Sequence, residues 1–403
     1  MADVAAPAQA RSSALEILGV FLRLGLTCFG GPVAHMGYFR AEFIAKRRWL
    51  DEAGFADLLA LAQFLPGPAS SEFGFAVGLL RGGLLGAFCA WLGFTLPSAL
   101  IMGGFAYGVA RAGSLAGAAW LHGLMLVAVA VVALAVWQMA RRLANDVPRG
   151  VLALAATAIV LLLPPNWSQF VAIGFGAVIG RLFLSTDVRA ATMHFAPPVS
   201  RGVAIGALVA FGVLLALSPV VAAATHATSA QLFDGFYRSG SLVFGGGHLI
   251  LPLLDAVVVP KGWVSQDTFL AGYGATQALP GPLSTFAAFL GVAMQPSPGG
   301  LIGGLIALVA IFLPGSLLIL GTLPFWSELR RNQAMQSTLK GVNAAVVGLL
   351  LAALYRPVFV SAVFNWRDLA FAAAALVLLR IRVPPWAVVI LGALGGEALA
   401  RLS

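Results

Sequence analysis

Long apolar runs, separated by short polar segments, make up most of this chain. Runs near the ~20 residues that a helix needs to cross a bilayer recur, for example at 85–110, 115–140 and 301–325. No stretch sustains the alternation of polar and apolar residues that a membrane β-barrel requires. The pattern therefore predicts an all-α polytopic membrane protein.

The same series of segments occurs in both halves of the chain. A first helix ends at a glycine cluster, and a polar loop with a Trp follows. Two segments too short to span alone then flank a Pro-Gly-Pro. A long helix with an internal proline, a smooth apolar helix and a closing pair complete the series. The shorter segments are predicted at 14–29, 55–65, 70–80, 151–163 and 170–184, and at 231–244, 268–279, 284–294, 369–379 and 387–399.

Matching positions confirm that the sequence is duplicated, because they keep nearly constant spacing. Arg23 and Arg238 differ by 215 positions, and Pro66 and Pro280 by 214. We expect a first repeat at 14–185, a linker at 186–229 that contains an extra apolar helix (202–224), and a second repeat at 230–403. Such paired, Gly/Pro-interrupted segments are typical of secondary transporters.

The basic loops of the second half fall one crossing out of phase with those of the first, which favours inverted repeats. The number of crossings fits only if the linker helix does not cross fully or one short segment does. The sequence favours inversion without fixing that count.

Composition narrows the class further. The chain is 60% hydrophobic and 10% charged, so it belongs in a lipid bilayer. Its net charge of +9 comes largely from basic residues between apolar runs, such as Lys46-Arg47-Arg48, which is the pattern of topology signals rather than of nucleic-acid binding. We find no Walker P-loop and no metal-binding or acid/base cluster in the apolar segments. The sequence therefore predicts no enzyme, cofactor or metal site.

Two backbone breaks carry the candidate chemistry: Pro66-Gly67-Pro68 and Pro280-Gly281-Pro282. Prolines around a glycine force the chain out of helical geometry, and irregular backbone at membrane depth must be buried in protein or line a cavity. Hydroxyl residues follow each break (Ser70-Ser71 and Ser284-Thr285), where a new helix would start with free N–H groups that favour anions. The alternative is a pair of structural kinks whose hydroxyls only cap helices.

Arg23 and Arg238 lie inside the first helix of each repeat, six residues before Phe-Gly-Gly clusters that contain Gly30-Gly31 and Gly245-Gly246. Because an arginine at membrane depth is costly, both are candidate anion ligands. The alternative is snorkelling to a headgroup, or pairing with an acid such as Asp234 or Glu16.

Other polar residues near the breaks have two interpretations each. Glu72 could carry a proton beside an anion site, or could cap a helix. His35 and His248 could titrate or serve a structural hydrogen bond. Gln63 and Gln277, three residues before each break, could donate to an oxyanion or satisfy freed carbonyls.

At these residues the chain resembles the chromate ion transporter family, in its long form with two fused homologous domains. The resemblance covers about residue 14 to the end. It rests on motifs present in both halves: Phe29-Gly30-Gly31-Pro32, Arg48-Trp49-Leu50, Gln63 to Pro68 and Phe94 to Ser98, then Phe244 to His248, Gly262-Trp263-Val264, Gln277 to Pro282 and Phe312 to Gly315. The second half departs from the first at Gly247, which stands where the first has Pro32, and it lacks a counterpart of Glu72.

The resemblance implies export of chromate across the bacterial cytoplasmic membrane, driven by the proton motive force, with sulfate as the structural analogue. The expected partners are the oxyanion and the lipid bilayer, with a homodimer as an option and no nucleic acid. A sulfate or other oxyanion transporter, or an anion channel, of the same fold remains the alternative. The candidate substrate-binding residues are Arg23, Gly30, Gly31, Gln63, Pro66, Gly67, Pro68, Ser70, Ser71, Arg238, Gly245, Gly246, His248, Gln277, Pro280, Gly281, Pro282, Ser284 and Thr285, with Glu72 as the candidate for proton coupling.

Overall fold

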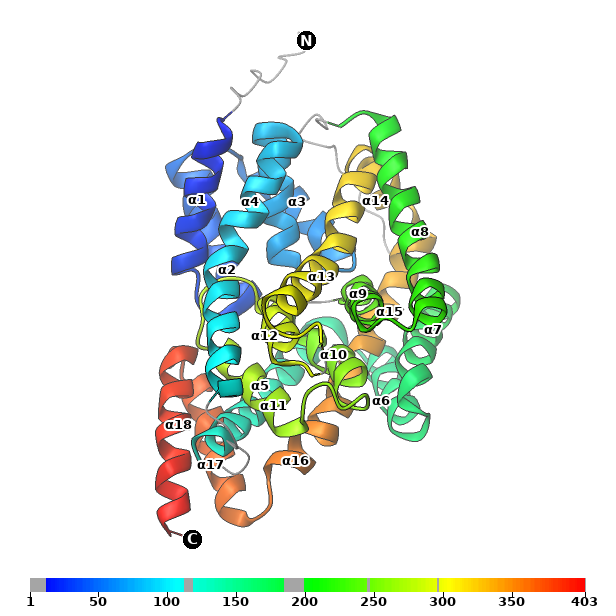
Figure 1. The fold of residues 1–403 in the computed structure, drawn as a ribbon. Coiled ribbons are helices and arrows are strands. Elements are labelled where there is room, and N and C mark those ends of the chain that lie inside the picture. The colour runs from blue at the N-terminus through cyan, green and yellow to red at the C-terminus, as the bar shows by residue number, and fades with distance from the viewer. Residues whose placement is uncertain (1–11, 112–118, 185–198, 245–246, 296, 403) are drawn as a thin grey trace.

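The computed structural model describes residues 12–111, 119–184, 199–244, 247–295 and 297–402. This part of the chain is all helix and connecting turns (Figure 1). The first half contains α1 (Ala14–Thr27), α2 (Gly31–Arg40), α3 (Glu52–Phe64), α4 (Ala69–Arg111), α5 (Ala119–Leu143), α6 (Val147–Leu162) and α7 (Pro165–Phe183). The linker helix is α8 (Arg201–Thr225). The second half contains α9 (Thr228–Ser241), α10 (Ile250–Val258), α11 (Gln266–Thr276), α12 (Phe286–Ala293), α13 (Gly300–Thr322), α14 (Trp326–Arg331), α15 (Gln333–Ala353), α16 (Val360–Ala362), α17 (Trp366–Arg380) and α18 (Pro385–Leu402).

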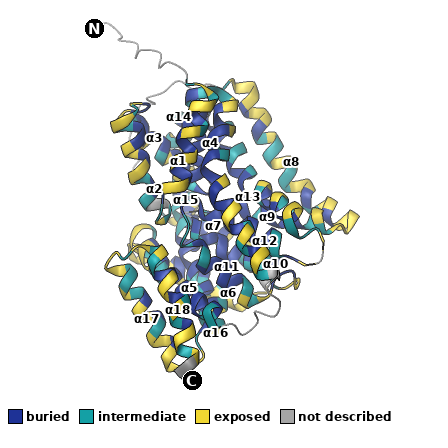
Figure 2. Cartoon of the chain, turned by 60° about the vertical axis from the view of Figure 1, so that its left-hand side comes forward, coloured by how far each residue is buried: buried dark blue, intermediate teal, exposed yellow. Residues whose placement is uncertain are grey.

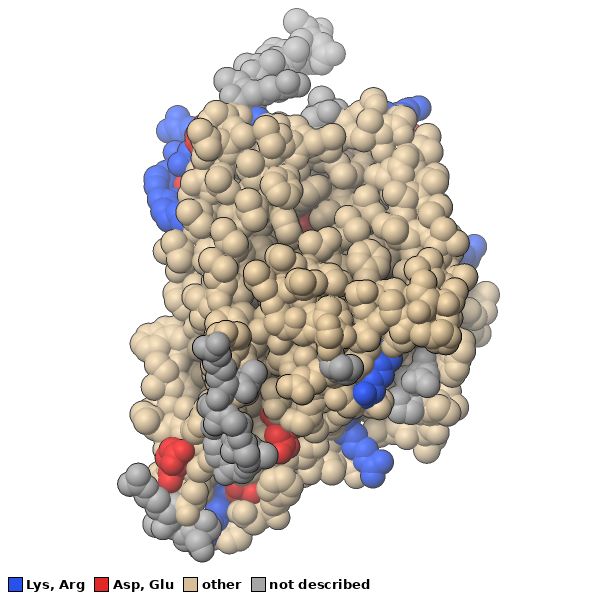
Figure 3. All heavy atoms as spheres, viewed as in Figure 1, with Lys and Arg blue, Asp and Glu red and all other residues tan. Residues whose placement is uncertain are grey.

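Several of these helices have the length and composition to cross a membrane. Within the described residues, five helical stretches qualify: Ala69–Val109, Ala119–Leu143, Arg201–Thr225, Gly300–Arg331 and Gln333–Ala362. Exposed residues run along α8, α17 and α18 (Figure 2). They include large apolar ones such as Val209, Leu369 and Ile390, as contact with lipid requires. Figure 3 shows one face on which charged side chains gather at the upper left and in the lower half, with broad uncharged areas elsewhere. The prediction of an all-α polytopic protein is confirmed.

The two Pro-Gly-Pro segments interrupt the helices as the sequence predicts. Helix α3 ends at Phe64 because the following Leu65 is extended (φ −82°, ψ 152°) in front of a proline. Helix α4 starts after the first Pro-Gly-Pro and bends at Gly82 and Gly83, whose backbone is not helical. The short segment predicted at 70–80 is therefore the first arm of a bent helix that continues through Pro97.

The prediction of a polar loop after the first helix is wrong. The structure has α2 there, continued by a π-helical turn at Ala41–Lys46. Phe39 and Phe43, one helical turn apart, are fully buried, and their rings pack against each other and against Phe73 of α4. This aromatic contact gives the segment a buried face. The many charged residues around it made the segment look like a loop in the sequence. The matching loop of the second half contains α10.

The last helices of each half, α6 and α7 in the first and α17 and α18 in the second, pack against helices of the other half. In the first half, α7 packs on α15 of the second, where Gly176 and Gly180 meet Gly341 so closely that a Cβ on Gly341 would lie 2.0 Å from the Gly176 carbonyl oxygen. In the second half, α18 packs on α5, where a Cβ on Gly123 would lie 2.0 Å from the carbonyl oxygen of Gly392. Small residues of this kind let membrane helices approach closely. Each repeat therefore completes its packing with helices of the other.

Candidate substrate site at the junction of the halves

The two Pro-Gly-Pro turns dock reciprocally on the opposite halves. The N–H of Gly67 donates to the carbonyl oxygen of Val243 (2.7 Å), just after α9, and the N–H of Gly281 donates to that of Cys28 (2.9 Å), just after α1. The two glycines are 214 positions apart and the two acceptors 215, so these are the same contact made twice. Reciprocal contacts of this kind indicate an approximate two-fold relation at the junction.

Each turn also packs against the proline-containing helix of the opposite half. A Cβ on Gly67 would lie 3.2 Å from the Cα of Gly315 in α13, next to Pro314. A Cβ on Gly281 would lie 2.8 Å from Oγ of Ser98 in α4, next to Pro97. Both turn glycines have positive φ angles, 149° and 91°, which favour glycine. All four sequence breaks therefore converge at one junction.

The hydroxyl groups that follow each turn are buried and do not act as helix caps. Oγ of Ser70 lies 3.1 Å from Nδ1 of His35, and Oγ1 of Thr285 donates to the carbonyl of Pro282. The Oγ atoms of Ser71 and Ser284 are buried without a hydrogen-bond partner among the described residues. A buried hydroxyl without a partner costs about 1–3 kcal/mol, so these groups are suited to a ligand that accepts hydrogen bonds.

Glu72 lies in the first turn of α4 at the same junction. Its side chain is 3% exposed, and neither carboxyl oxygen has a hydrogen-bond partner within the described chain. The carboxyl occupies a notch that two glycines of opposite halves leave open, since a Cβ on Gly67 or Gly315 would lie 1.8 or 2.5 Å from Oε1. It therefore sits between the two repeats, and in the second half the corresponding position is Phe286.

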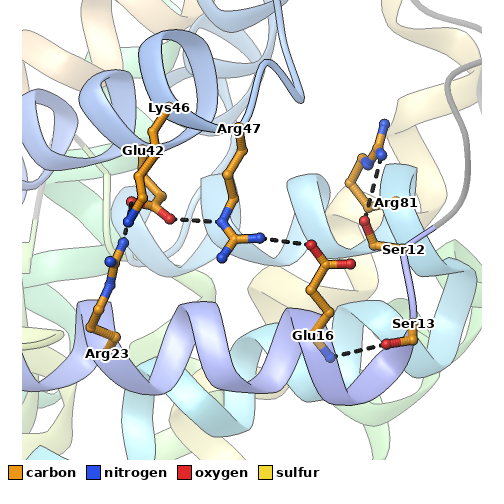
Figure 4. A network of polar contacts seen from close by, with 8 residues as sticks. All are labelled: Ser12, Ser13, Glu16, Arg23, Glu42, Lys46, Arg47 and Arg81. Carbon is orange, nitrogen blue, oxygen red and sulfur yellow. Dashed lines mark hydrogen bonds and ion pairs between the residues drawn. The ribbon is translucent and has the colours of Figure 1, made fainter.

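Both arginines are engaged with acids of their own repeat. Arg23 pairs with the buried Glu42 (Figure 4), and Arg238 pairs with Asp234 at 2.5 Å. Their side chains are 47% and 37% exposed. The described contacts of each guanidinium group run to these acids and not to the hydroxyl-bearing turns. The pairing with Asp234 that the sequence left open is present, and any contact of Arg23 or Arg238 with substrate stays a prediction.

The remaining candidates are placed unequally. Gly30 and Gly31, both at positive φ, begin α2. Gln63 is exposed, whereas Nε2 of Gln277 is buried without a partner in the described residues. His248 contacts the hydroxyl of Tyr273 at 3.1 Å. Gly245 and Gly246 lie outside the described residues.

Sequence reasoning did not select two buried polar residues near the second turn. Ser98 contacts Gly281, and Thr95 has a buried Oγ1 without a described partner. The available signal was a pair of hydroxyl residues flanking Pro97 within an otherwise apolar helix. Together with Ser70 and Ser284, they make the junction rich in hydrogen-bond donors.

A duplicated bundle of membrane helices whose broken segments meet between the halves defines the class of multi-pass transport proteins. Comparison with known proteins identifies the family. The model of the chromate transporter family matches residues 15–181 and 230–397. The chain therefore belongs to the chromate transporter family.

Similar curated relatives carry the same description. A chromate transport protein of Pseudomonas aeruginosa is 31% identical over 83% of this chain and 79% of its own length. A probable chromate transport protein of Synechococcus elongatus is 29% identical over 84% and 83%. A chromate transport protein of Cupriavidus metallidurans is 26% identical over 84% and 81%. No solved structure matches the chain significantly.

Proposed function

We propose that this protein exports chromate, a tetrahedral dianion, across the cytoplasmic membrane, driven by the proton motive force. The observation that carries the proposal is the reciprocal docking of the two Pro-Gly-Pro turns. It brings buried hydroxyls from both repeats to one junction. Hydroxyl groups that donate hydrogen bonds stabilise an oxyanion away from water.

Alternating access would follow from the same symmetry. The repeats 14–185 and 230–403 are inverted in this proposal, so that rocking one against the other exposes the junction to each side in turn. The bonds from Gly67 to Val243 and from Gly281 to Cys28 are equivalent contacts between the repeats. Breaking one and keeping the other opens the junction on one side only.

Glu72 is the proposed proton carrier. A carboxyl buried between the repeats without a partner is most easily accommodated when neutral, because an unpaired buried charge is costly. If rocking moves Gly67 away from Gly315, the carboxyl becomes accessible and can release its proton. The charge of Glu72 would then be linked to the arrangement of the repeats and to the binding of a dianion nearby.

The membrane potential supports the outward direction. An inside-negative potential favours expulsion of each negative charge by about 2.3 kcal/mol per 100 mV. Export of a dianion therefore needs little additional coupling. Sulfate has the same charge and shape, so a transporter for sulfate or another oxyanion is the alternative within the same site.

Uptake into inverted membrane vesicles tests this function. We expect energised vesicles with the full chain to accumulate labelled chromate, with saturable kinetics and competition by sulfate, and to lose that accumulation when the proton gradient is collapsed. Counterflow of chromate would separate a transporter from a channel. Absence of uptake, or uptake that ignores the gradient, would overturn proton-driven chromate export.

A further inference from the structure

Each repeat builds a cluster of cations around one buried carboxylate. In the first, which we name cluster 1, Arg23 and Arg47 bind the carboxylate of Glu42 from two sides, and Nζ of Lys46 lies 3.8 Å from it (Figure 4). Glu16 accepts a further bond from Arg47 at 2.7 Å. The cations outnumber the acids by one. The Glu42 side chain is 6% exposed, whereas the three cations are between 26% and 56% exposed.

The second repeat contains a corresponding group, cluster 2. Arg238 binds the carboxylate of Asp234, which also accepts a hydrogen bond from Ser218 of α8 at 2.8 Å. Lys261 follows α10, whose Val257 packs against Gly235, next to Asp234, and Lys261 interacts electrostatically with both charges of this pair. Cations again outnumber acids by one. The acid is 7% exposed and Arg238 is 37% exposed, and Nε of Arg238 is buried without a partner in the described chain.

The clusters correspond by position and by a shared aromatic support. Arg47 and Lys261 are 214 positions apart, as are Trp49 and Trp263. The Arg47 guanidinium lies 5.2 Å from the centre of the Trp49 ring, and Nζ of Lys261 lies 4.3 Å from that of Trp263. A cation over an indole ring is held in place at little cost in hydration. Both repeats thus keep an arginine on their first helix and a second cation over a tryptophan, although the acids come from different positions.

Both clusters lie at the same distance along the chain from the junction. Arg23 precedes Cys28 by five residues, and Arg238 precedes Val243 by five. Helices α1 and α9 end at Thr27 and Ser241, so at 1.5 Å rise per residue each arginine lies within about 6 Å of the end of its helix. Cys28 and Val243 are the two carbonyls that receive the Pro-Gly-Pro turns. An anion held at either cluster is therefore near the end of the helix that leads to the proposed substrate site.

We propose that clusters 1 and 2 are entrance sites for the oxyanion, at which the substrate displaces the carboxylate of Glu42 or Asp234 from its cations. In the structure the carboxylates of Glu42 and Asp234 pair with the guanidinium groups, in the place that the substrate oxyanion would take. Because the cations reach the surface and the carboxylates of Glu42 and Asp234 do not, an arriving dianion meets the cations first. The inference rests on the proposed transport function. With inverted repeats, each cluster serves one side of the membrane.

Side-specific kinetics of chromate uptake test this assignment, with inside-out and right-side-out vesicles containing the full chain. We expect Arg47→Gln to raise KM about fivefold on one face, and Lys261→Gln to do so on the other, near the upper end of what a partly exposed charge contributes. Glu42→Gln and Asp234→Asn should lower KM on the same faces as their cluster partners. If Glu42 and Asp234 had only a structural role, removing their charge would not improve the affinity for chromate.

Arg40→Gln is the matched control, because Arg40 lies next to cluster 1 but pairs with the exposed Glu52. Its KM should equal that of the original protein. Arg47→Lys should retain most of the affinity, which separates loss of charge from loss of fold. The assignment is overturned if the original protein transports chromate while Arg47→Gln and Lys261→Gln leave KM unchanged, or if Glu42→Gln raises KM. Failure of the original protein to transport any oxyanion would instead overturn the proposed function.

Discussion

Replacing Gly281 by alanine is expected to lower the rate of chromate transport at least tenfold. A Cβ at this position would lie 2.8 Å from Oγ of Ser98 and 3.2 Å from the carbonyl oxygen of Phe94. The positive φ angle of 91° adds strain of about 1–3 kcal/mol for a residue with a side chain. The turn would therefore move away from the opposite repeat, and its bond to Cys28 would lengthen. Initial rates of vesicle uptake, normalised to the amount of protein, measure the effect.

Gly300→Ala is the matched control for this substitution. Gly300 also has a positive φ angle, 68°, but a Cβ there would have no atom within 4 Å. Its variant carries the backbone strain without the clash and should keep most of the transport rate. Adding Ser98→Gly to Gly281→Ala should restore part of the rate by making room. Full activity of Gly281→Ala would show that close docking of the turn is dispensable.

Replacing Glu72 by glutamine is expected to abolish accumulation driven by the proton gradient while chromate exchange continues. Glutamine preserves the shape that fits between Gly67 and Gly315, but it cannot take up or release a proton. The repeats can still rock around the substrate, so counterflow should persist. The measurement compares gradient-driven uptake with counterflow in the same vesicles.

Glu52→Gln provides the control for loss of one acid, since Glu52 is an exposed partner of Arg40 at 61% exposure. We expect it to behave like the original protein in both assays. If Glu72→Gln accumulates chromate in response to the proton gradient as well as the original protein does, then Glu72 does not carry the coupled proton.

The long apolar helices of this fold were predictable because lipid imposes a simple pattern on the sequence. The linker helix, expected at 202–224, occurs as α8 at Arg201–Thr225. The apolar run expected at 301–325 corresponds to α13 and the short helical turn Leu323–Phe325 that follows it. The duplication was visible in the spacing of Arg23 and Arg238. The helix after α1 was not predictable because it is amphipathic. Its segment carries many charges, and only the burial of Phe39 and Phe43 in the structure shows why it is helical.

The exchange of closing helices between the halves was not predictable from the repeat. A duplicated sequence is equally consistent with two self-contained halves, and the contact of Gly176 with Gly341 joins residues that no local pattern relates. The domain boundaries that the spacing suggests stay a prediction, since packing at the junction is shared by both repeats.

The two turns of the candidate site were predictable from the sequence, whereas the ion-pair partners of its charged residues were not. Irregular backbone in a membrane must be buried or line a cavity, and the turns at 66–68 and 280–282 do pack between the halves. That substrate binds there stays a prediction. The partner of Arg23 could not be foreseen, because Glu42 lies in a π-helical turn within a segment expected to be a loop. The notch around Glu72 depends on Gly315, which is far away in the sequence.

Locating bound chromate is the most direct test of the central claim that the oxyanion binds where the two turns meet. Chromium scatters anomalously, so a crystal of the full chain with chromate would reveal its position. We expect a chromium peak between the two Pro-Gly-Pro turns, with oxyanion oxygens about 3 Å from Oγ of Ser71 or Ser284. Chromate found only elsewhere, with both hydroxyls still unoccupied at saturating substrate, would contradict it.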